Sequence, residues 1–294
     1  MLLLILDAFD PSLPKKLEAF GEVSTDSSRL SEADVVLVRS KTLCDKQFID
    51  SATNVKLILR GGVGIDNIDA EYAKSKGIYV LNTPKSSAVA VAELAFALMI
   101  SVPTRLIEVH NGMKNGQWLK NTKRTELYGK TLALLGMGNI ASKLAERARA
   151  FGMKVVAYDK YVASSLVAKL VPTLEDAVRE ADYISLHLPL TSETSFLFCD
   201  SLINACKRSP VVINTGRGNC IDPQAMSKAL EDGRISWYAA DVYPTDPPDA
   251  DYPLLASDRV TLTPHIGASS EENLLRIGDE AFHIIQEMIA GGVL

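Results

Sequence analysis

Cysteine and histidine are scarce in this sequence, with four of each among 294 residues. No C-x-x-C pair occurs, and no cysteine stands at a metal-ligand spacing from a histidine. We therefore expect no metal site and no cysteine that acts as a nucleophile or ligand. Each cysteine is interpreted as a small buried side chain, and the four positions are Cys44, Cys199, Cys206 and Cys220.

The chain also lacks an excess of positive charge and a long apolar run. Its net charge is −5 at pH 7, which supplies no electrostatic attraction to nucleic acid or to an anionic membrane. The longest apolar stretch, Ala88 to Val102, contains Glu93 and falls short of the ~20 residues that a membrane span needs. The apolar start, Met1 to Leu6, is too short for a signal peptide and follows no basic region. These absences predict a cytoplasmic protein with no membrane and no nucleic-acid partner.

What the sequence does have is an ample apolar fraction, arranged in alternating short and long patterns. Hydrophobic residues make up 47% of the chain and charged residues 23%, as in a globular protein. Short runs rich in Val, Ile and Leu alternate with helical patterns, which is typical of a parallel sheet covered by helices. The first predicted strands are Leu2–Leu6, Val35–Val38, Leu57–Leu59 and Ile78–Leu81, followed by one long helix over Ser86–Gly112. The later strands are Leu132–Leu135, Lys154–Tyr158, Tyr183–Leu186, Val211–Asn214, Trp237–Ala240 and Val260–Leu262, and a closing helix spans Glu271–Ala290.

The two strand series predict two α/β domains. The later series is a complete set for a Rossmann-type doubly wound parallel sheet, whereas the earlier one has too few strands for a second copy. We therefore predict a smaller, flavodoxin-like α/β substrate-binding domain over residues 1–90 and 270–294. Residues 91–269 are predicted to form the nucleotide-binding Rossmann domain.

A glycine-containing turn follows the first strand of the later series. The segment Thr131–Ala141 is a strand that runs into G-x-G-x-x-A and then into an amphipathic helix. Gly136 allows a tight turn, and Gly138 lets the backbone approach a pyrophosphate because no Cβ stands in the way. A plain strand-to-helix turn without a ligand is the alternative interpretation.

The context of this turn favours a dinucleotide. The free N–H groups of Asn139 and Ile140 would face phosphates at the positive end of the helix. Asp159 follows the next strand, where a carboxylate accepts hydrogen bonds from the adenosine ribose and repels a 2′-phosphate. The predicted cofactor is therefore NAD rather than NADP.

Further polar groups follow later strands of the same domain. His187, Arg217 and His265 each come just after a predicted strand, where open parallel sheets place their ligands. The planar fork of Arg217 suits capture of a carboxylate. His265, with Asp246 some way before it, suits a proton donor held by a carboxylate. Taken singly, Arg217 has a structural ion pair as its alternative, and His265 has a surface position.

These residues together resemble a known family. Over essentially its full length, the chain is similar to the D-isomer-specific 2-hydroxyacid dehydrogenases. The segments that carry the resemblance are Arg60–Asp69, Asn82–Pro84, Ala92–Glu93, Thr125–Thr131, the turn at Gly136, His187–Pro189, Asn214–Gly218, Asp241–Val242 and Pro264–Ala268. A methyltransferase-like or homocysteine-linked Rossmann protein would explain neither Arg217 nor His265.

The resemblance implies a hydride transfer between NAD and C2 of a small D-2-hydroxy acid. It implies a catalytic set of Arg217, Asp246 and His265 and a homodimer formed through residues 88–118. The expected cofactor-binding residues are Gly136, Gly138, Asn139, Ile140, Asp159, His187, Pro189, Thr191, Thr215, Gly216, Asp241 and Gly267. The expected substrate-binding residues are Arg39, Arg60, Gly61, Gly62, Val63, Gly64, Arg217 and His265.

Two departures from the family pattern bear on these expectations. Asp246 stands where the family usually has Glu, so the histidine must lie closer or be reached through water. Val63 stands where phosphoglycerate-oxidising members often have Thr. The resemblance is nonetheless greatest to that branch, in a short form without a C-terminal regulatory domain, which implies 3-phosphoglycerate and 3-phosphohydroxypyruvate as substrates and a place in serine biosynthesis.

A phosphorylated substrate needs convergent positive charge, for which Arg39, Arg60 and Lys41 are the candidates. If these side chains do not converge, glyoxylate or hydroxypyruvate reduction is the better interpretation. A non-enzymatic NAD-binding regulator of the same fold is the remaining alternative.

Overall fold

The computed structural model describes all 294 residues and divides the chain into two compact units. The first unit comprises Met1–Ala88 and Ala268–Leu294, and the second comprises Val89–Gly267. The sequence placed these boundaries after residues 90 and 269. Each unit is an α/β layer structure built on its own parallel sheet, so the predicted fold class is confirmed.

The first unit contains a sheet with the strand order β2-β1-β3-β4-β5. All of its strand pairs are parallel, and the order is that of flavodoxin-like folds. The strands are β1 (Leu2–Ile5), β2 (Glu22–Ser24), β3 (Val35–Val38), β4 (Leu57–Arg60) and β5 (Tyr79–Asn82). The sequence analysis missed β2, because this edge strand is only three residues long and two of them are polar.

Helices cover both faces of this sheet. Alternate strand residues point to opposite faces, so Leu4 and Val36 pack on one side and Leu3 and Val35 on the other. One face is covered by α2 (Lys46–Ser51) and α3 (Ala70–Ser75), and the other by α1 (Leu13–Leu17) and α10 (Glu271–Ala290).

Helix α10 also forms hydrogen bonds with both segments through which the chain passes between the first unit and the second. The Asn273 Nδ2 group donates hydrogen bonds to the Ala268 carbonyl at 2.9 Å and to the Ser87 hydroxyl at 3.2 Å. Arg276 Nε donates to the Ser86 carbonyl at 3.2 Å. Asn273 is fully buried, so the two crossing segments are held to one helix in the interior of this unit.

The second unit contains a larger sheet with the order β12-β11-β10-β9-β6-β7-β8. The strands are β6 (Thr131–Leu135), β7 (Lys154–Tyr158), β8 (Lys169–Leu170), β9 (Tyr183–Leu186), β10 (Val211–Asn214), β11 (Trp237–Ala240) and β12 (Val260–Leu262). The chain progresses outward from β6 to β8 and then in the other direction from β9 to β12. The topological switch point, where such sheets bind their ligands, therefore lies between β6 and β9.

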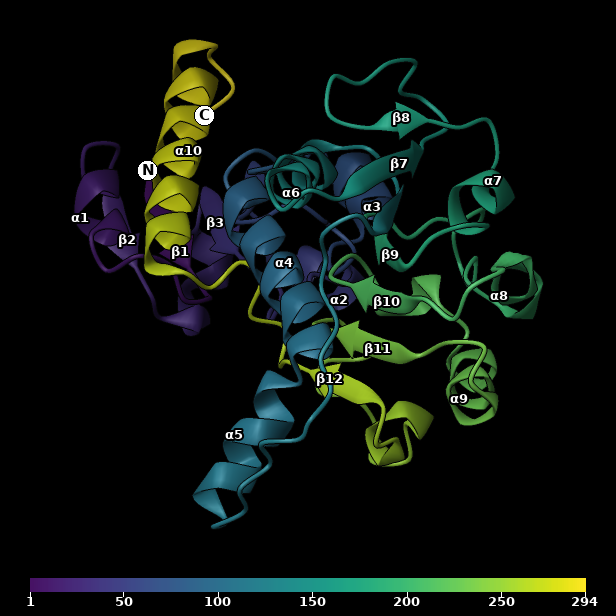
Figure 1. Cartoon of the computed structure of the whole chain (residues 1–294). Helices are drawn as coiled ribbons and strands as arrows, with labels where there is room; N and C mark the ends of the chain where they lie inside the picture. The colour runs from purple at the N-terminus through teal and green to yellow at the C-terminus, as the bar shows by residue number, and fades with distance from the viewer. The chain divides into compact units, whose positions relative to one another are not determined.

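This larger sheet is also covered on both faces. In Figure 1, β9 to β12 lie side by side, and helices follow one another along one flank. These are α7 (Leu174–Val178), α8 (Asp200–Ala205) and α9 (Pro223–Asp232), which pack in one apolar cluster. Helices α4 (Ala88–Thr104) and α6 (Asn139–Ala150) pack in the other cluster. The short β8 was missed by the sequence analysis because two residues carry no periodic pattern.

The single long helix predicted over residues 86–112 is wrong. The structure has α4 and then α5 (Leu106–Lys114), with an angle of 66° between them. Pro103 lies in the last turn of α4, and Arg105 adopts a left-handed φ of 53°. Proline removes an N–H donor and clashes with the preceding turn, which ends a helix. No single helix of the structure has the length and hydropathy to cross a membrane, although α4 and α5 taken together pass that test.

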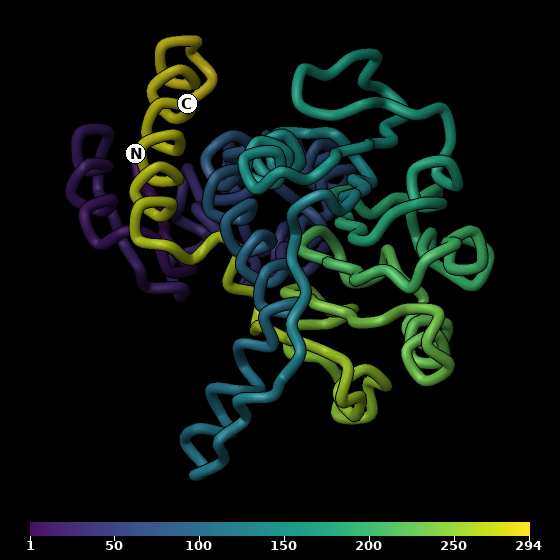
Figure 2. The backbone as a smooth tube through the Cα atoms, in the orientation of Figure 1, coloured from purple at the N-terminus to yellow at the C-terminus, as the bar shows by residue number.

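Helix α5 projects from the rest of the second unit (Figures 1 and 2). The chain after it turns back, since the Gln117 N–H donates to the Gly112 carbonyl at 2.9 Å and the Thr125 N–H to the Pro103 carbonyl at 3.1 Å. Several large apolar side chains remain exposed on this hairpin, notably Leu106, Ile107, Met113 and Trp118.

Candidate active site

Three adjacent strand ends of the second unit carry the predicted catalytic residues. The strands β10, β11 and β12 are neighbours and parallel, so their carboxyl ends lie at one edge of the sheet. Arg217 follows β10, Asp246 lies in the loop after β11, and His265 follows β12. The sheet order therefore brings the three loops together, although the residues are far apart in sequence.

His265 and Asp246 form a direct pair. The His265 Nδ1 atom hydrogen-bonds to the Asp246 Oδ2 atom. The shorter aspartate side chain therefore reaches the ring without an intervening water. Because Nδ1 is engaged, the ring is oriented and Nε2 is the nitrogen left for a substrate. The side chains are 36% and 46% exposed, respectively, so the pair is open to a small molecule.

The loop that bears His265 is held by Asp241, at the end of β11. This carboxylate is 2% exposed and accepts hydrogen bonds from the Thr263 hydroxyl at 2.6 Å, the Ile266 N–H at 2.9 Å and the Gly267 N–H at 2.8 Å. Between these anchors, the backbone of His265 adopts a left-handed φ of 55°. Residues with positive φ other than glycine are uncommon and concentrate at functional sites. Asp241 was expected to touch the cofactor, and its contacts in this structure are with the His265 loop.

The loop that bears Arg217 is held by the buried side chain of Asn214. The Asn214 Oδ1 atom accepts a hydrogen bond from the Gly216 N–H at 3.1 Å, and its Nδ2 donates to the Arg217 carbonyl at 2.9 Å. Gly218 lies so close to Tyr243 that a Cβ would come within 2.0 Å of the Tyr243 carbonyl carbon. Only glycine fits there, and the contact joins the Arg217 loop to the loop that leads to Asp246.

Sequence reasoning missed these supporting residues. Asn214 was named only as part of the family segment Asn214–Gly218 and was given no role, and Thr263, directly after β12, carries no motif. Tyr243 likewise links two loops through its hydroxyl, which donates to the Thr263 carbonyl at 2.8 Å. Such partners depend on which strands are neighbours, and that is decided by the tertiary fold.

The glycine turn lies at the switch point of the sheet. Gly136 has a φ of +93°, and a Cβ there would come within 2.7 Å of the His187 carbonyl oxygen, so both conformation and packing require glycine. Gly138 is different, because its φ of −77° is ordinary and a Cβ would meet nothing within 4 Å. Neither conformation nor packing inside the chain demands glycine at 138. The open space is what a phosphate lying on the N-terminus of α6 would occupy.

Asp159 connects the glycine turn with the loop after β7. One of its oxygens accepts a hydrogen bond from the Met137 N–H at 2.7 Å. The other accepts from the N–H groups of Tyr161 at 2.8 Å and Val162 at 3.1 Å. The carboxylate is therefore fixed beside the turn, in the position expected of the acid that binds the adenosine ribose.

Two polar atoms near the switch point are shielded from solvent and have no partner within the chain. They are His187 Nδ1, after β9, and Thr215 Oγ1, after the neighbouring β10. Buried polar groups nearly always have a hydrogen-bond partner, so two such atoms without one indicate a bound ligand or water. Desolvation lowers the pKa of His187 to about 4, which keeps the ring neutral. These atoms and the open face of Gly138 fit a dinucleotide such as NAD.

Other predicted cofactor residues lie in the loop after β9 and at the start of α6. In the loop after β9, Thr194 Oγ1 accepts a hydrogen bond from the Thr191 N–H at 2.8 Å and donates to the Pro189 carbonyl at 2.6 Å. Asn139 and Ile140 begin α6, whose first N–H groups have no partner within a helix.

In the first unit, the predicted substrate residues follow β3 and β4. Gly61 to Gly64 were expected to bind the substrate, and two of their N–H groups are engaged within the chain. The Gly61 N–H donates to the Val38 carbonyl and the Gly62 N–H to the Thr83 hydroxyl, both at 2.8 Å, and both glycines are buried. Of this segment, only Val63 and Gly64 remain for a ligand.

The three candidate cations behave differently from one another. Arg39 donates to the carbonyls of Ala8 and Ala268, each at 3.2 Å, and burial lowers its pKa. The Arg60 side chain folds over Gly62, where a Cβ would lie 1.9 Å from Nη1. Lys41 is exposed. The two Nη groups of Arg39 are engaged by backbone oxygens, whereas its Nε is buried and has no hydrogen-bond partner within the chain.

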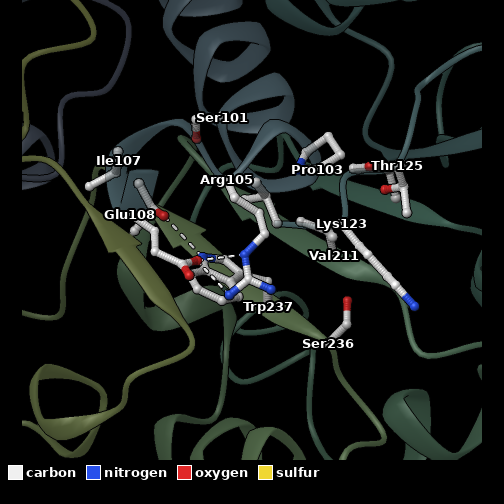
Figure 3. A pocket seen from close by; sticks show the side chains of 13 residues that line it. Ser101, Pro103, Arg105, Ile107, Glu108, Lys123, Thr125, Val211, Ser236 and Trp237 are labelled. Atoms are coloured by element: carbon white, nitrogen blue, oxygen red, sulfur yellow. Dashed lines mark hydrogen bonds and ion pairs between the residues drawn. The ribbon is translucent and has the colours of Figure 1, made fainter. Parts of the chain in front are cut away.

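A pocket of about 350 Å³ lies in the second unit. Figure 3 shows Arg105 and Glu108 above Trp237, with Lys123 and Ser236 at the rim. Three of the strand residues that line it, Tyr183, Val211 and Trp237, begin their strands. The pocket therefore lies toward the amino edge of the sheet, opposite the edge that carries Arg217 and His265.

Comparison with known proteins decides the family. The model of the D-isomer specific 2-hydroxyacid dehydrogenase NAD-binding domain matches residues 96–267, more than half of the chain. The chain belongs to the D-isomer specific 2-hydroxyacid dehydrogenase family. Its second unit is thus the NAD-binding domain of this family, and the predicted cofactor and family are confirmed.

Among curated relatives, D-3-phosphoglycerate dehydrogenase of Methanocaldococcus jannaschii is 38% identical over 98% of this chain. The chain spans only 57% of that protein, and about half of several other D-3-phosphoglycerate dehydrogenases. Hydroxypyruvate reductase of Thermotoga maritima is 41% identical over 85% of this chain and 83% of its own length.

Solved structures agree with the fold of the whole chain. The D-lactate dehydrogenase of Aquifex aeolicus, complexed with NAD and lactic acid, matches 99% of this chain and 96% of its own with a TM-score of 0.86 and 28% identity. The TT0316 protein of Thermus thermophilus matches 99% of this chain and 97% of its own with a TM-score of 0.90 and 30% identity.

Proposed function

We propose that the protein is an NAD-dependent dehydrogenase that interconverts a D-2-hydroxy acid and its 2-keto acid. The observation that carries this proposal is the His265–Asp246 pair beside the Arg217 loop, at the edge of a sheet that also holds the dinucleotide turn. When bound, NAD would accept the hydride that leaves C2 of the hydroxy acid, and NADH would return it to C2 of the keto acid. The chain supplies the proton transfer and the charge that orients the substrate.

His265 is the proposed general acid and base. Its Nε2 takes the hydroxyl proton in oxidation and returns it to the carbonyl oxygen in reduction. The Asp246 carboxylate holds the ring by Nδ1 and stabilises the imidazolium that forms. Arg217 binds the substrate carboxylate through its guanidinium, an electrostatic role that is usually worth a few kcal/mol of barrier.

The proposed substrate pair is 3-phosphoglycerate and 3-phosphohydroxypyruvate. It is supported by the similarity to D-3-phosphoglycerate dehydrogenases over almost the whole chain. In this proposal, Arg60 and Lys41 are the candidate cations for the phosphate.

Hydroxypyruvate is the second candidate, and two observations favour it. Both Nη groups of Arg39 are bound to backbone carbonyls, which leaves fewer of its donors for a phosphate. The hydroxypyruvate reductase of Thermotoga maritima also matches over most of its own length. Glyoxylate, which carries no third carbon, is the related smaller substrate.

One panel of assays tests the activity and the substrate. NADH oxidation is followed at 340 nm with 3-phosphohydroxypyruvate, hydroxypyruvate, glyoxylate and pyruvate. Turnover of one keto acid that falls by about 100-fold or more in His265→Gln supports the proposal. Binding of ADP-ribose without turnover of any keto acid would instead support a non-enzymatic NAD-binding regulator.

We further propose a homodimer formed through residues 88–118. The α5 hairpin presents exposed apolar side chains, with Trp118 75% exposed, and the pocket in Figure 3 lies at the base of α5. Exposed apolar patches of this kind mark interfaces. Sedimentation of the wild-type chain and of Trp118→Ala tests it: a dimer that weakens in the variant is expected, and a monomeric wild type contradicts the proposal.

A further inference from the structure

An ion pair spans the glycine turn of the second unit. The Lys160 ammonium lies 2.9 Å and 2.7 Å from the two carboxylate oxygens of Glu193. Lys160 follows β7 and Glu193 lies in the loop after β9, and these strands flank β6 on either side. The turn at Gly136–Gly138 follows β6, so the pair links the loops on both sides of the proposed phosphate site.

The pair lies next to the residue that faces the adenosine ribose. Lys160 directly follows Asp159, whose carboxylate is fixed by the Met137, Tyr161 and Val162 N–H groups. A lysine in this position would be a natural partner for a 2′-phosphate, since ammonium groups bind phosphate as point charges. The hydrogen bond to Glu193 raises the pKa of Lys160 and keeps it charged, but directs that charge to a carboxylate.

We propose that Glu193 is a specificity-determining residue that enforces NAD over NADP by holding the Lys160 ammonium away from the ribose 2′ position. The inference rests on the proposed use of NAD by this site. Asp159 repels a 2′-phosphate directly, and Glu193 removes the neighbouring cation that would otherwise offset that repulsion. Lys160 and Glu193 act through charge and position and take no part in the hydride or proton transfer.

The size of the effect follows from exposure. The Lys160 and Glu193 side chains are 53% and 66% exposed, so water and salt screen their interaction. Loss of the carboxylate should therefore change the affinity for a 2′-phosphate on the order of fivefold rather than by several orders of magnitude. The effect should shrink as ionic strength rises.

Calorimetric titration of the full chain with ADP-ribose and with 2′-phospho-ADP-ribose tests this without turnover. Glu193→Gln should strengthen 2′-phospho-ADP-ribose binding on the order of fivefold and change ADP-ribose binding by less than about twofold. Glu180→Gln is the matched control. Glu180 precedes β9 and forms ion pairs with Lys207 and Arg208, so it lies at the amino ends of the strands and not at the carboxyl ends that carry the glycine turn. The control should leave the ratio of the two affinities unchanged.

The double variant Glu193→Gln with Lys160→Met isolates the lysine. If the freed ammonium provides the gain, the double variant should lose it. A gain that persists without the lysine, or no gain in Glu193→Gln itself, overturns the inference. Failure of the wild-type chain to bind ADP-ribose at all would instead contradict the proposed NAD-dependent function, so the two proposals fail by different results.

Discussion

Asp241 holds the loop that carries His265, and Asp241→Asn tests how far that loop decides activity. The substitution keeps the shape of the side chain but replaces one acceptor oxygen by an NH₂ group. With the amide oxygen facing Thr263 and Ile266, the NH₂ group meets the Gly267 N–H, donor against donor, in a site that is 2% exposed.

The expected cost follows from these contacts. A hydrogen bond to a charged group contributes about 1.5–3 kcal/mol, and an unpaired buried donor costs about 1–3 kcal/mol. We expect a loss of about 3 kcal/mol in the free energy of unfolding, which lowers the Tm by about 6–12 °C in a domain of this size. A displacement of His265 by about 1 Å would reduce kcat by about 100-fold.

Thermal unfolding and NADH-linked turnover measure the two effects. Asp251→Asn is a suitable control, because Asp251 is an exposed aspartate in the same unit and the substitution removes the same charge. A Tm within 2 °C of wild type together with kcat within a factor of about two would show that Asp241 neither supports the loop nor positions His265.

Three further predictions follow from the site. Arg217→Lys should raise KM by about tenfold or more with a smaller loss of kcat, because lysine lacks the paired contact; an unchanged KM would exclude carboxylate capture. Gly138→Ala should weaken ADP-ribose binding by about tenfold while changing the free energy of unfolding by at most about 1 kcal/mol, since only a ligand requires the open space. Equal losses in the free energy of binding and in the free energy of unfolding would point to a structural role. His187 has a pKa lowered from 6.5 to about 4, so the unfolded state binds the proton first as pH falls through that window, and up to about 3 kcal/mol of stability is lost between pH 6.5 and 4. The free energy of unfolding of His187→Asn, measured with denaturant, should lack that part of the pH dependence. A plot of this free energy against pH that runs parallel to the wild-type plot would contradict the prediction.

Much of the fold could be predicted because each central strand is buried on both faces. Such strands are continuous apolar runs, and Tyr183–Leu186, Val211–Asn214 and Trp237–Ala240 were predicted with the bounds that the structure shows. The edge strands β2 and β8 are short and partly polar, so the sequence carries little trace of them. The predicted helix ran through Pro103 without a break, and the left-handed Arg105 at which α4 and α5 separate depends on packing.

The amino-acid sequence by itself determined the order of strands and helices, the glycine turn with Asp159, and the family, because these depend on local patterns and spacing. Tertiary structure alone decided which groups meet. It paired His265 directly with Asp246, engaged both oxygens of Asp241, and bound both Nη groups of Arg39 to backbone carbonyls. Hydrogen bonds between residues remote in sequence depend on which strands become neighbours, and strand order is a property of the folded sheet rather than of any segment within it.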